Sequence, residues 1–169
     1  QKNLAVELLQ KLMKDEMKTR FKNNIVKQKQ FSELLQNALD KYSNRAIEAA
    51  QVIEELIQMA KAFKEDLDKA KKMNLNESEV AFYDALSDNN SAKELMDDEL
   101  LVKIAREVAE KLRKNVTVDW NVKESVRAKL RLIIKNILKR YKYPPDEEKK
   151  AIDLVLIQAE QFSEEWSVN

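Results

Sequence analysis

Apolar residues along this chain recur every three or four positions, the spacing that places them on one side of an α-helix. The pattern comes in segments, which polar or proline-containing stretches separate, and no region is rich in the alternation typical of strands. The sequence therefore predicts an all-α fold, a single irregular bundle of about seven helices with one long central helix.

The first half of the chain carries three of these segments. The opening stripe weakens near residues 18–24, a second helix is expected from Gln30 to Tyr42, and the longest pattern starts at Asn44. The first stripe consists of Leu4, Ala5, Leu8, Leu9, Leu12 and Met13. The third segment covers about 28 residues, or roughly 42 Å of helix. Its apolar face is wide enough to indicate packing on more than one side, as expected of the central helix.

Capping residues predict where the next two helices begin. Asn76 followed by Glu79 has the spacing of a capping box, and residues 87–91 form a polar loop. After a brief turn at residues 92–96, the carboxylates of residues 97–99 suit the positive end of a helix dipole. We interpret this acidic cluster as a helix N-terminus and not as a cation site.

The last third of the chain predicts two further helices. After a possible extended link at Val116–Trp120, Asn121 is the expected N-cap of a strongly amphipathic helix that Tyr143-Pro144-Pro145 ends. The final helix is expected from about Asp146. Trp120 and Trp166 are interpreted as packing residues, and so are Tyr141 and Tyr143, although tyrosines beside basic residues can also stack on bases. Residues 1–169 are expected to form one domain.

The amino-acid composition argues against several kinds of catalytic and binding site. The chain has no glycine, histidine or cysteine, so it lacks the usual material of phosphate loops, general bases, zinc sites and thiol nucleophiles. We predict no catalytic, cofactor-binding or metal-binding residues in this part of the protein. No stretch approaches a membrane span, and the lack of cysteine fits a reducing compartment, so a cytoplasmic location without membrane contact is expected. A start at Gln1 suggests a fragment, although processing gives the same start.

Charge is distributed unevenly along the chain. Residues 1–30 and 123–142 are rich in Lys and Arg, whereas residues 74–110 and 144–166 are rich in Asp and Glu. Within the second basic segment, cations recur every fourth residue beside the apolar row of the predicted helix. This basic ridge consists of Lys123, Arg127, Arg131, Lys135 and Lys139.

The basic ridge has two interpretations. Its side chains either lay their alkyl stems along the core edge and pair with the acidic segments, or contact an outside partner. In the second case the partner is an acidic protein or a nucleic-acid backbone, because regularly spaced Lys and Arg can follow phosphates without reading sequence. Both interpretations stay open at this point.

Several short motifs occur together in one order. They are "NRAIEAAQVIEELI" at 44–57, "AFYDAL" at 81–86, "NVTVDW" at 115–120, "ESVRAKLR" at 124–131, "YPPD" at 143–146 and "SEEW" at 163–166. With them, almost the whole chain resembles the C-terminal helical region of type I restriction enzyme endonuclease (R) subunits. One departure is Lys142, where relatives often have glycine, so the end of that helix either takes a left-handed residue at some cost or is built differently.

The resemblance implies a part of a larger, multidomain subunit. Such subunits are ATP-dependent DNA motors with a nuclease domain, and their ATP and Mg²⁺ sites have no counterpart in these residues. The helical region is then an assembly element with partners in the methyltransferase and specificity subunits and in the other domains of its own subunit. The alternative is a module that binds the DNA backbone without sequence specificity. A further, enzymatic interpretation has the least support in the sequence.

Overall fold

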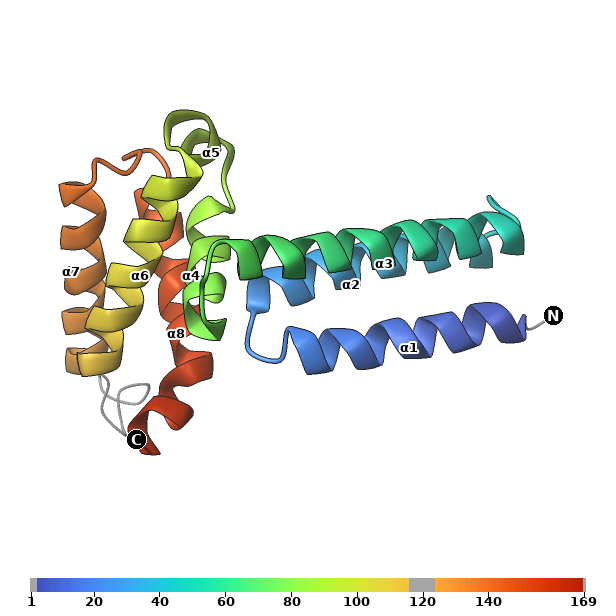
Figure 1. Ribbon diagram of the computed structural model, residues 1–169, viewed down its shortest axis with the longest axis horizontal. Coiled ribbons are helices and arrows are strands. Elements are labelled where there is room, and N and C mark those ends of the chain that lie inside the picture. The colour runs from blue at the N-terminus through green and yellow to red at the C-terminus, as the bar shows by residue number, and fades with distance from the viewer. Residues whose placement is uncertain (1–2, 116–123, 169) are drawn as a thin grey trace. The chain divides into compact units, whose positions relative to one another are not determined.

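The computed structural model describes residues 3–115 and 124–168. Over these residues it contains eight α-helices and no strand, which confirms the all-α fold class (Figure 1). The chain divides into two compact units, Gln1–Asn74 and Leu75–Asn169. The expectation that the two units behave as one domain stays a prediction. No helix in the described part is long and apolar enough to cross a membrane.

The first unit consists of three helices, each packed against the other two (Figure 1). These are α1 (Leu4–Arg20), α2 (Ile25–Ser43) and α3 (Ala49–Lys72), and α3 is the longest described helix, with 24 residues. The side chain of Asn3 caps α1 by accepting from two backbone N–H groups, and that of Asn24 caps α2 by accepting from the N–H of Lys27 at 3.1 Å. Such caps satisfy donors that the first turn of a helix leaves without partners.

Three phenylalanines, one from each helix or its end, form the centre of this unit. The ring centroids of Phe21, Phe31 and Phe63 lie 4.4–5.6 Å apart. The rest of the core comes from one face of each helix and comprises Val6, Met13, Met17, Leu35, Ala38, Val52, Leu56 and Met59. Aromatic contacts at these separations stabilise a core beyond their buried area alone.

The predicted apolar stripe of α1 is only partly buried. Val6, Met13 and Met17 are buried, whereas Leu4, Leu8 and Leu12 are exposed. The first half of α1 is apolar on two faces, so the local pattern does not decide which of them enters the core. The face of Val6 prevails because its spacing continues through Met13 and Met17 to Phe21 and the aromatic cluster.

Two predicted helix starts also differ from the structure. Helix α2 begins at Ile25 and not at Gln30, because Asn24 caps it. Helix α3 begins at Ala49 and not at Asn44, because the chain first reverses direction. Arg45 has a φ of 60°, and the next N–H, that of Ala46, donates to the carbonyl of Lys41 at 2.8 Å. This bond closes the end of α2 before α3 starts.

The second unit contains the other five helices (Figure 1). They are α4 (Glu77–Ser87), α5 (Asn90–Leu95), α6 (Asp98–Asn115), α7 (Glu124–Arg140) and α8 (Glu148–Val168). Helix α4 packs against α5, α6 and α8, and α7 packs against α6 and α8. The core is formed by almost fully buried side chains, among them Phe82, Leu86, Leu101, Ile104, Leu112, Leu130, Ile134, Leu138, Leu156 and Phe162.

Both predicted caps in this unit are confirmed. The side chain of Asn76 accepts from the N–H of Glu79, whose carboxylate accepts from the N–H of Asn76, each at 2.9 Å. Asp97 accepts from the N–H of Leu100 at 2.8 Å, so the acidic cluster does start a helix.

Trp166 packs as expected, with its ring 5.6 Å from that of Phe162. The predictions for Val116–Trp120 and Asn121 lie outside the described residues.

Helix α7 ends with a lysine in the left-handed conformation. Lys142 has a φ of 58°. Its N–H donates to the carbonyl of Lys139 at 3.0 Å, and the N–H of Tyr143 donates to that of Leu138 at 2.9 Å. These two bonds define a Schellman motif, which commonly places an apolar contact between the residues that correspond to Tyr143 and Leu138. Both of these side chains are buried, so lysine occupies a place that glycine fills at lower cost.

Tyr143 ties the turn after α7 to the turn after α4. Its hydroxyl donates to the carbonyl oxygen of Leu86 and accepts from Nδ2 of Asn89, both at 2.5 Å. A second link lies nearby, where the Ser91 hydroxyl donates to Asp146 at 3.1 Å. Burial raises the pKa of Tyr143 to about 12. The "YPPD" segment therefore has a structural role, and Tyr143 is not available for stacking on bases.

Replacing Lys142 by glycine is expected to stabilise the chain. A non-glycine residue in the left-handed region costs about 1–2 kcal/mol. Glycine avoids this cost, but part of the gain is lost because glycine has more conformational freedom in the unfolded state. We expect Lys142→Gly to raise the free energy of unfolding by about 0.5–1 kcal/mol in urea titrations followed by circular dichroism. Lys139→Gly, inside the last turn of α7, is the control and should destabilise by about 1 kcal/mol. A destabilised Lys142→Gly chain would contradict the assigned helix end.

Raising the pH above 10 is expected to weaken the fold through Tyr143. Its pKa is about 12 in the folded chain against an ordinary 10.0, so in this range the unfolded chain binds fewer protons than the folded chain. The stabilising contribution is complete below pH 10 and is lost as the pH rises towards 12, at up to about 1.4 kcal/mol per pH unit.

The matching variant is Tyr143→Phe, which removes the titrating hydroxyl. It should lower the free energy of unfolding at neutral pH by about 1–3 kcal/mol, since the buried carbonyl of Leu86 loses its donor. Urea titrations between pH 8 and 11 should then show a shallower decline for the variant than for the natural chain. Parallel pH profiles for the two chains would refute the assignment.

Candidate interaction site

Four of the five residues of the basic ridge lie on α7. They are Arg127, Arg131, Lys135 and Lys139, and Lys123 lies outside the described residues. An open groove runs along the outer side of this helix and is lined by Glu124, Arg127, Ala128, Arg131, Leu132 and Lys135. Because residues four apart advance by about 40° around a helix, the ridge turns gradually away from the core.

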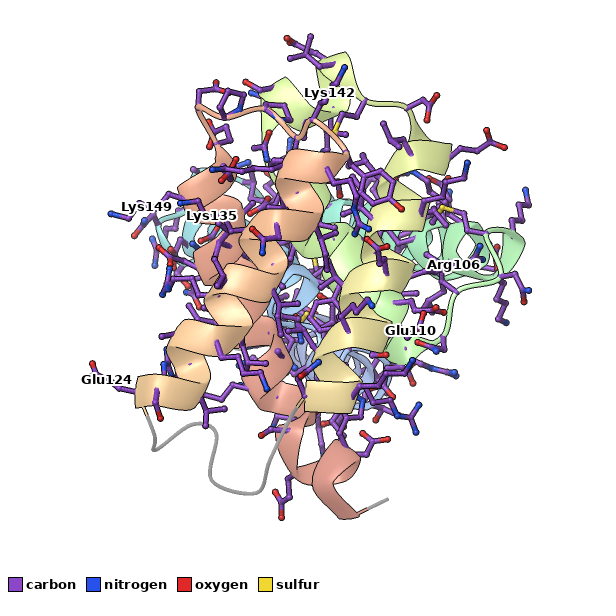
Figure 2. All side chains as sticks on the ribbon, turned by 90° about the vertical axis from the view of Figure 1, so that its left-hand side faces the viewer. Arg106, Glu110, Glu124, Lys135, Lys142 and Lys149 are labelled. Carbon is purple, nitrogen blue, oxygen red and sulfur yellow. The ribbon has the colours of Figure 1, made fainter. Side chains whose placement is uncertain are left out.

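The four cations have different surroundings. Arg127 is half-buried, and Nη1 of Arg131 lies 2.5 Å from the carboxylate of Asp153 on α8. Lys135 and Lys139 are exposed and form no ion pair with a described residue. In Figure 2, Lys135 of α7 and Lys149 of α8 project towards the same side of the view. The ridge thus divides into a part held against α8 and a part open to solvent.

Neighbouring cations also pair within the unit. Arg140, at the end of α7, forms an ion pair with Glu107 of α6, and Arg106 of α6 lies 4.0 Å from Glu79. The Arg140–Glu107 pair joins a basic to an acidic segment, as the first interpretation of the ridge expects, whereas Arg106 and Glu79 both lie in the acidic segment 74–110. Pairs as exposed as these contribute little to stability, so they orient the helices more than they hold them together. The role of the basic ridge stays a prediction.

The acidic cluster at the start of α6 is engaged in local contacts. Asp97 caps the helix, and the Tyr83 hydroxyl donates to Asp98 at 2.6 Å. Burial first, and the hydrogen bond to Asp98 second, raise the pKa of Tyr83. Within the described ranges, no three acidic side chains come together in an arrangement that could hold a metal ion.

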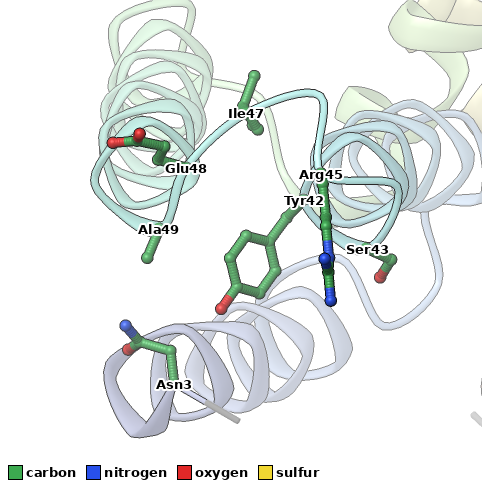
Figure 3. A pocket seen from close by; sticks show the side chains of 7 residues that line it. All are labelled: Asn3, Tyr42, Ser43, Arg45, Ile47, Glu48 and Ala49. Carbon is green, nitrogen blue, oxygen red and sulfur yellow. The ribbon is translucent and has the colours of Figure 1, made fainter. Parts of the chain in front are cut away.

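A polar pocket that the sequence does not predict lies at one end of the first unit (Figure 3). It is lined by Asn3, Tyr42, Ser43, Arg45, Ile47, Glu48 and Ala49. Figure 3 shows the ring of Tyr42 directed towards Asn3. Asn3 caps α1, and Glu48 forms a capping box with Gln51 at the start of α3. Two of its polar side chains are therefore already used to begin helices.

An exposed apolar feature on α1 also differs from what the sequence predicts. Leu4, Leu8 and Leu12, which belong to the predicted apolar stripe, are all exposed to solvent. We call these three residues the α1 leucine row. The signal was present in the sequence, because the start of α1 carries more apolar residues than one helix face holds.

Comparison with known proteins places this helical chain in a family. Residues 1–165 match the family described as "Type I restriction enzyme HindI endonuclease subunit-like, C-terminal". The chain belongs to this family. The resemblance predicted from the motifs is confirmed, and the structure is that of the C-terminal region of an endonuclease subunit.

Two curated relatives support the assignment. The type I restriction enzyme HindI endonuclease subunit of Haemophilus influenzae is 43% identical over 164 residues, which are 97% of this chain. A putative type I restriction enzyme MjaIXP endonuclease subunit of Methanocaldococcus jannaschii is 33% identical over 138 residues, which are 81% of this chain. The C-terminal region spans only 16% and 13% of these two relatives. No solved structure matches the chain.

Proposed function

We propose that this C-terminal region is an assembly element that docks its endonuclease subunit onto the methyltransferase and specificity subunits of a type I restriction enzyme. The parent protein performs ATP-driven DNA translocation and cleavage, with ATP and Mg²⁺ bound by its other domains. This region catalyses neither step and also contacts those other domains. We infer the cytoplasm as its compartment.

The observation that carries this proposal is the number of exposed large apolar side chains on the three-helix unit. Eight large apolar side chains are exposed in the described part of the chain, and five of them lie in this unit. These five are Leu4, Leu8, Leu12, Leu34 and Ile57. Contiguous exposed apolar surface marks protein interaction sites, and three of the five share one helix face.

A pull-down tests the docking role. The immobilised methyltransferase and specificity core should retain the 169-residue chain at micromolar concentration, while the methyltransferase of an unrelated system serves as the control. Circular dichroism of the same preparation establishes that the chain is helical. No retention of a helical chain by its own core would refute the docking role.

A second candidate function is contact with the DNA backbone through the basic ridge. Lys135 and Lys139 are exposed and form no ion pair with the residues that the structure describes, which favours this function because such cations can neutralise phosphates. The pairing of Arg131 with Asp153 speaks against a continuous contact along the whole ridge. The methyltransferase core therefore stays the preferred partner.

Salt dependence tests the DNA candidate. If Lys135 and Lys139 each contact a phosphate, changing both to Gln should reduce the slope of log affinity against log salt by about 1.8 on a mixed-sequence duplex. The control changes Lys103 and Lys111, two exposed lysines of α6, to Gln, which removes the same charge. Equal slopes for the two double variants would exclude a backbone contact through the ridge.

A further inference from the structure

The α1 leucine row is the most exposed apolar feature on one helix face in the described chain. The exposed fractions of Leu4, Leu8 and Leu12 are 79%, 58% and 50%. The three residues follow one another at a spacing of four, so they form one line along the helix. This line lies on the side of α1 opposite Val6, Met13 and Met17, the residues that enter the core.

The start of α1 has the composition of a helix that is covered on two sides. Its first ten residues include apolar side chains on the core face and on the opposite face. An apolar face on a helix is normally buried against another element. Within the first unit, α2 and α3 cover only the core face, because the leucine row stays exposed beside them. The row therefore fits an additional apolar partner.

The charged side chains next to the leucine row indicate the sign of the charge that this partner carries. Lys11, Lys14 and Lys18 are exposed on α1 and form no ion pair with any described residue. The same side of the helix also carries Glu7 and Asp15. Glu16 is already paired with Arg20, with 3.3 Å between Oε2 and Nε. The three lysines outnumber Glu7 and Asp15, so the net charge beside the leucine row is positive.

The groove between α1 and α2 extends this positive surface. Its polar lining consists of Lys14, Lys18, Gln28, Ser32 and Gln36, with two lysines and no carboxylate. A partner that covers the leucine row and approaches this groove meets lysines at its edge. Electrostatic complementarity across an interface then requires acidic side chains on the partner.

A protein helix fits this surface better than DNA or a membrane. Leucines at a spacing of four give no contact to a phosphate backbone, whereas an amphipathic helix buries such a row in helix-to-helix packing. An anionic lipid surface is typically recognised by a cluster of about four to eight basic residues, whereas this side of α1 carries three lysines together with Glu7 and Asp15. The observations therefore favour one class of partner.

We propose that the α1 leucine row is the docking face for an amphipathic helix of the methyltransferase and specificity core, a helix with an apolar stripe and acidic residues along its edge. This proposal rests on the proposed docking function and names the face and the partner chemistry. The leucines supply the buried apolar contact, and the three lysines guide the acidic partner into place.

The test compares two double variants in binding to the methyltransferase and specificity core by surface plasmon resonance. The first is Leu4→Gln with Leu8→Gln. The control is Leu95→Gln with Ile157→Gln, two apolar residues exposed by 74% and 46% in the second unit. We expect the first variant to bind about a hundredfold more weakly and the control to stay within about threefold of the natural chain.

A third variant tests the role of charge. Changing Lys11, Lys14 and Lys18 to Gln should lower the association rate about tenfold at low salt and flatten its salt dependence, with a smaller effect on dissociation. Thermal melting should be unchanged in all three variants, because every altered side chain is exposed. If the double leucine variant melts lower, the single variant Leu4→Gln, at the most exposed position, replaces it in the comparison.

The outcomes separate the two proposals. If the natural chain binds the core and the leucine variant binds equally well, the docking face is wrong and the docking function stands. If the natural chain does not bind, the docking function fails and the face falls with it. Leucine-dependent self-association in sedimentation, or leucine-dependent binding to anionic phospholipid vesicles, would also overturn the assigned partner.

Discussion

The turns between the described helices are made without glycine, and this constraint shapes the rest of the structure. Three residues with side chains, Arg45, Asn74 and Lys142, take the left-handed conformation, with φ of 60°, 55° and 58°. Each accepts a conformational cost of about 1–2 kcal/mol, somewhat less for asparagine. Backbone bonds at the helix ends and buried neighbours such as Tyr143 offset it.

The positions of these turns decide which helix faces meet. The turn at Arg45 delays α3 until Ala49, and the resulting three-helix unit buries the Val6 face of α1 and leaves the leucines outside. In the second unit, the end of α7 at Lys142 places Tyr143 against the carbonyl of Leu86. That contact fixes the register of α7, and with it the side of the unit on which Lys135 and Lys139 are presented. Turn geometry therefore positions both candidate interaction surfaces.

Local patterns predicted what depends on local interactions. The capping box at Asn76, the acidic start of α6 and the buried stripe of α7 each follow from neighbours a few residues away. The buried face of α1 depends on distant partners, so the pattern did not settle it. The start of α3 follows from the turn at Arg45, whose left-handed conformation the apolar pattern does not reveal. The Tyr143 link joins positions 54 and 57 residues apart, a pairing that no spacing rule reveals. The exposure of the leucine row likewise depends on where α2 and α3 pack.

We regard this C-terminal region as the part of an endonuclease subunit that holds an enzyme complex together. Its helices present apolar and basic side chains to solvent. Hydrogen–deuterium exchange of the intact endonuclease subunit, free and bound to its methyltransferase and specificity core, tests this most directly. We predict slower amide exchange across Leu4–Arg20 in the complex. Unchanged exchange throughout residues 3–115 and 124–168 would contradict the assembly role.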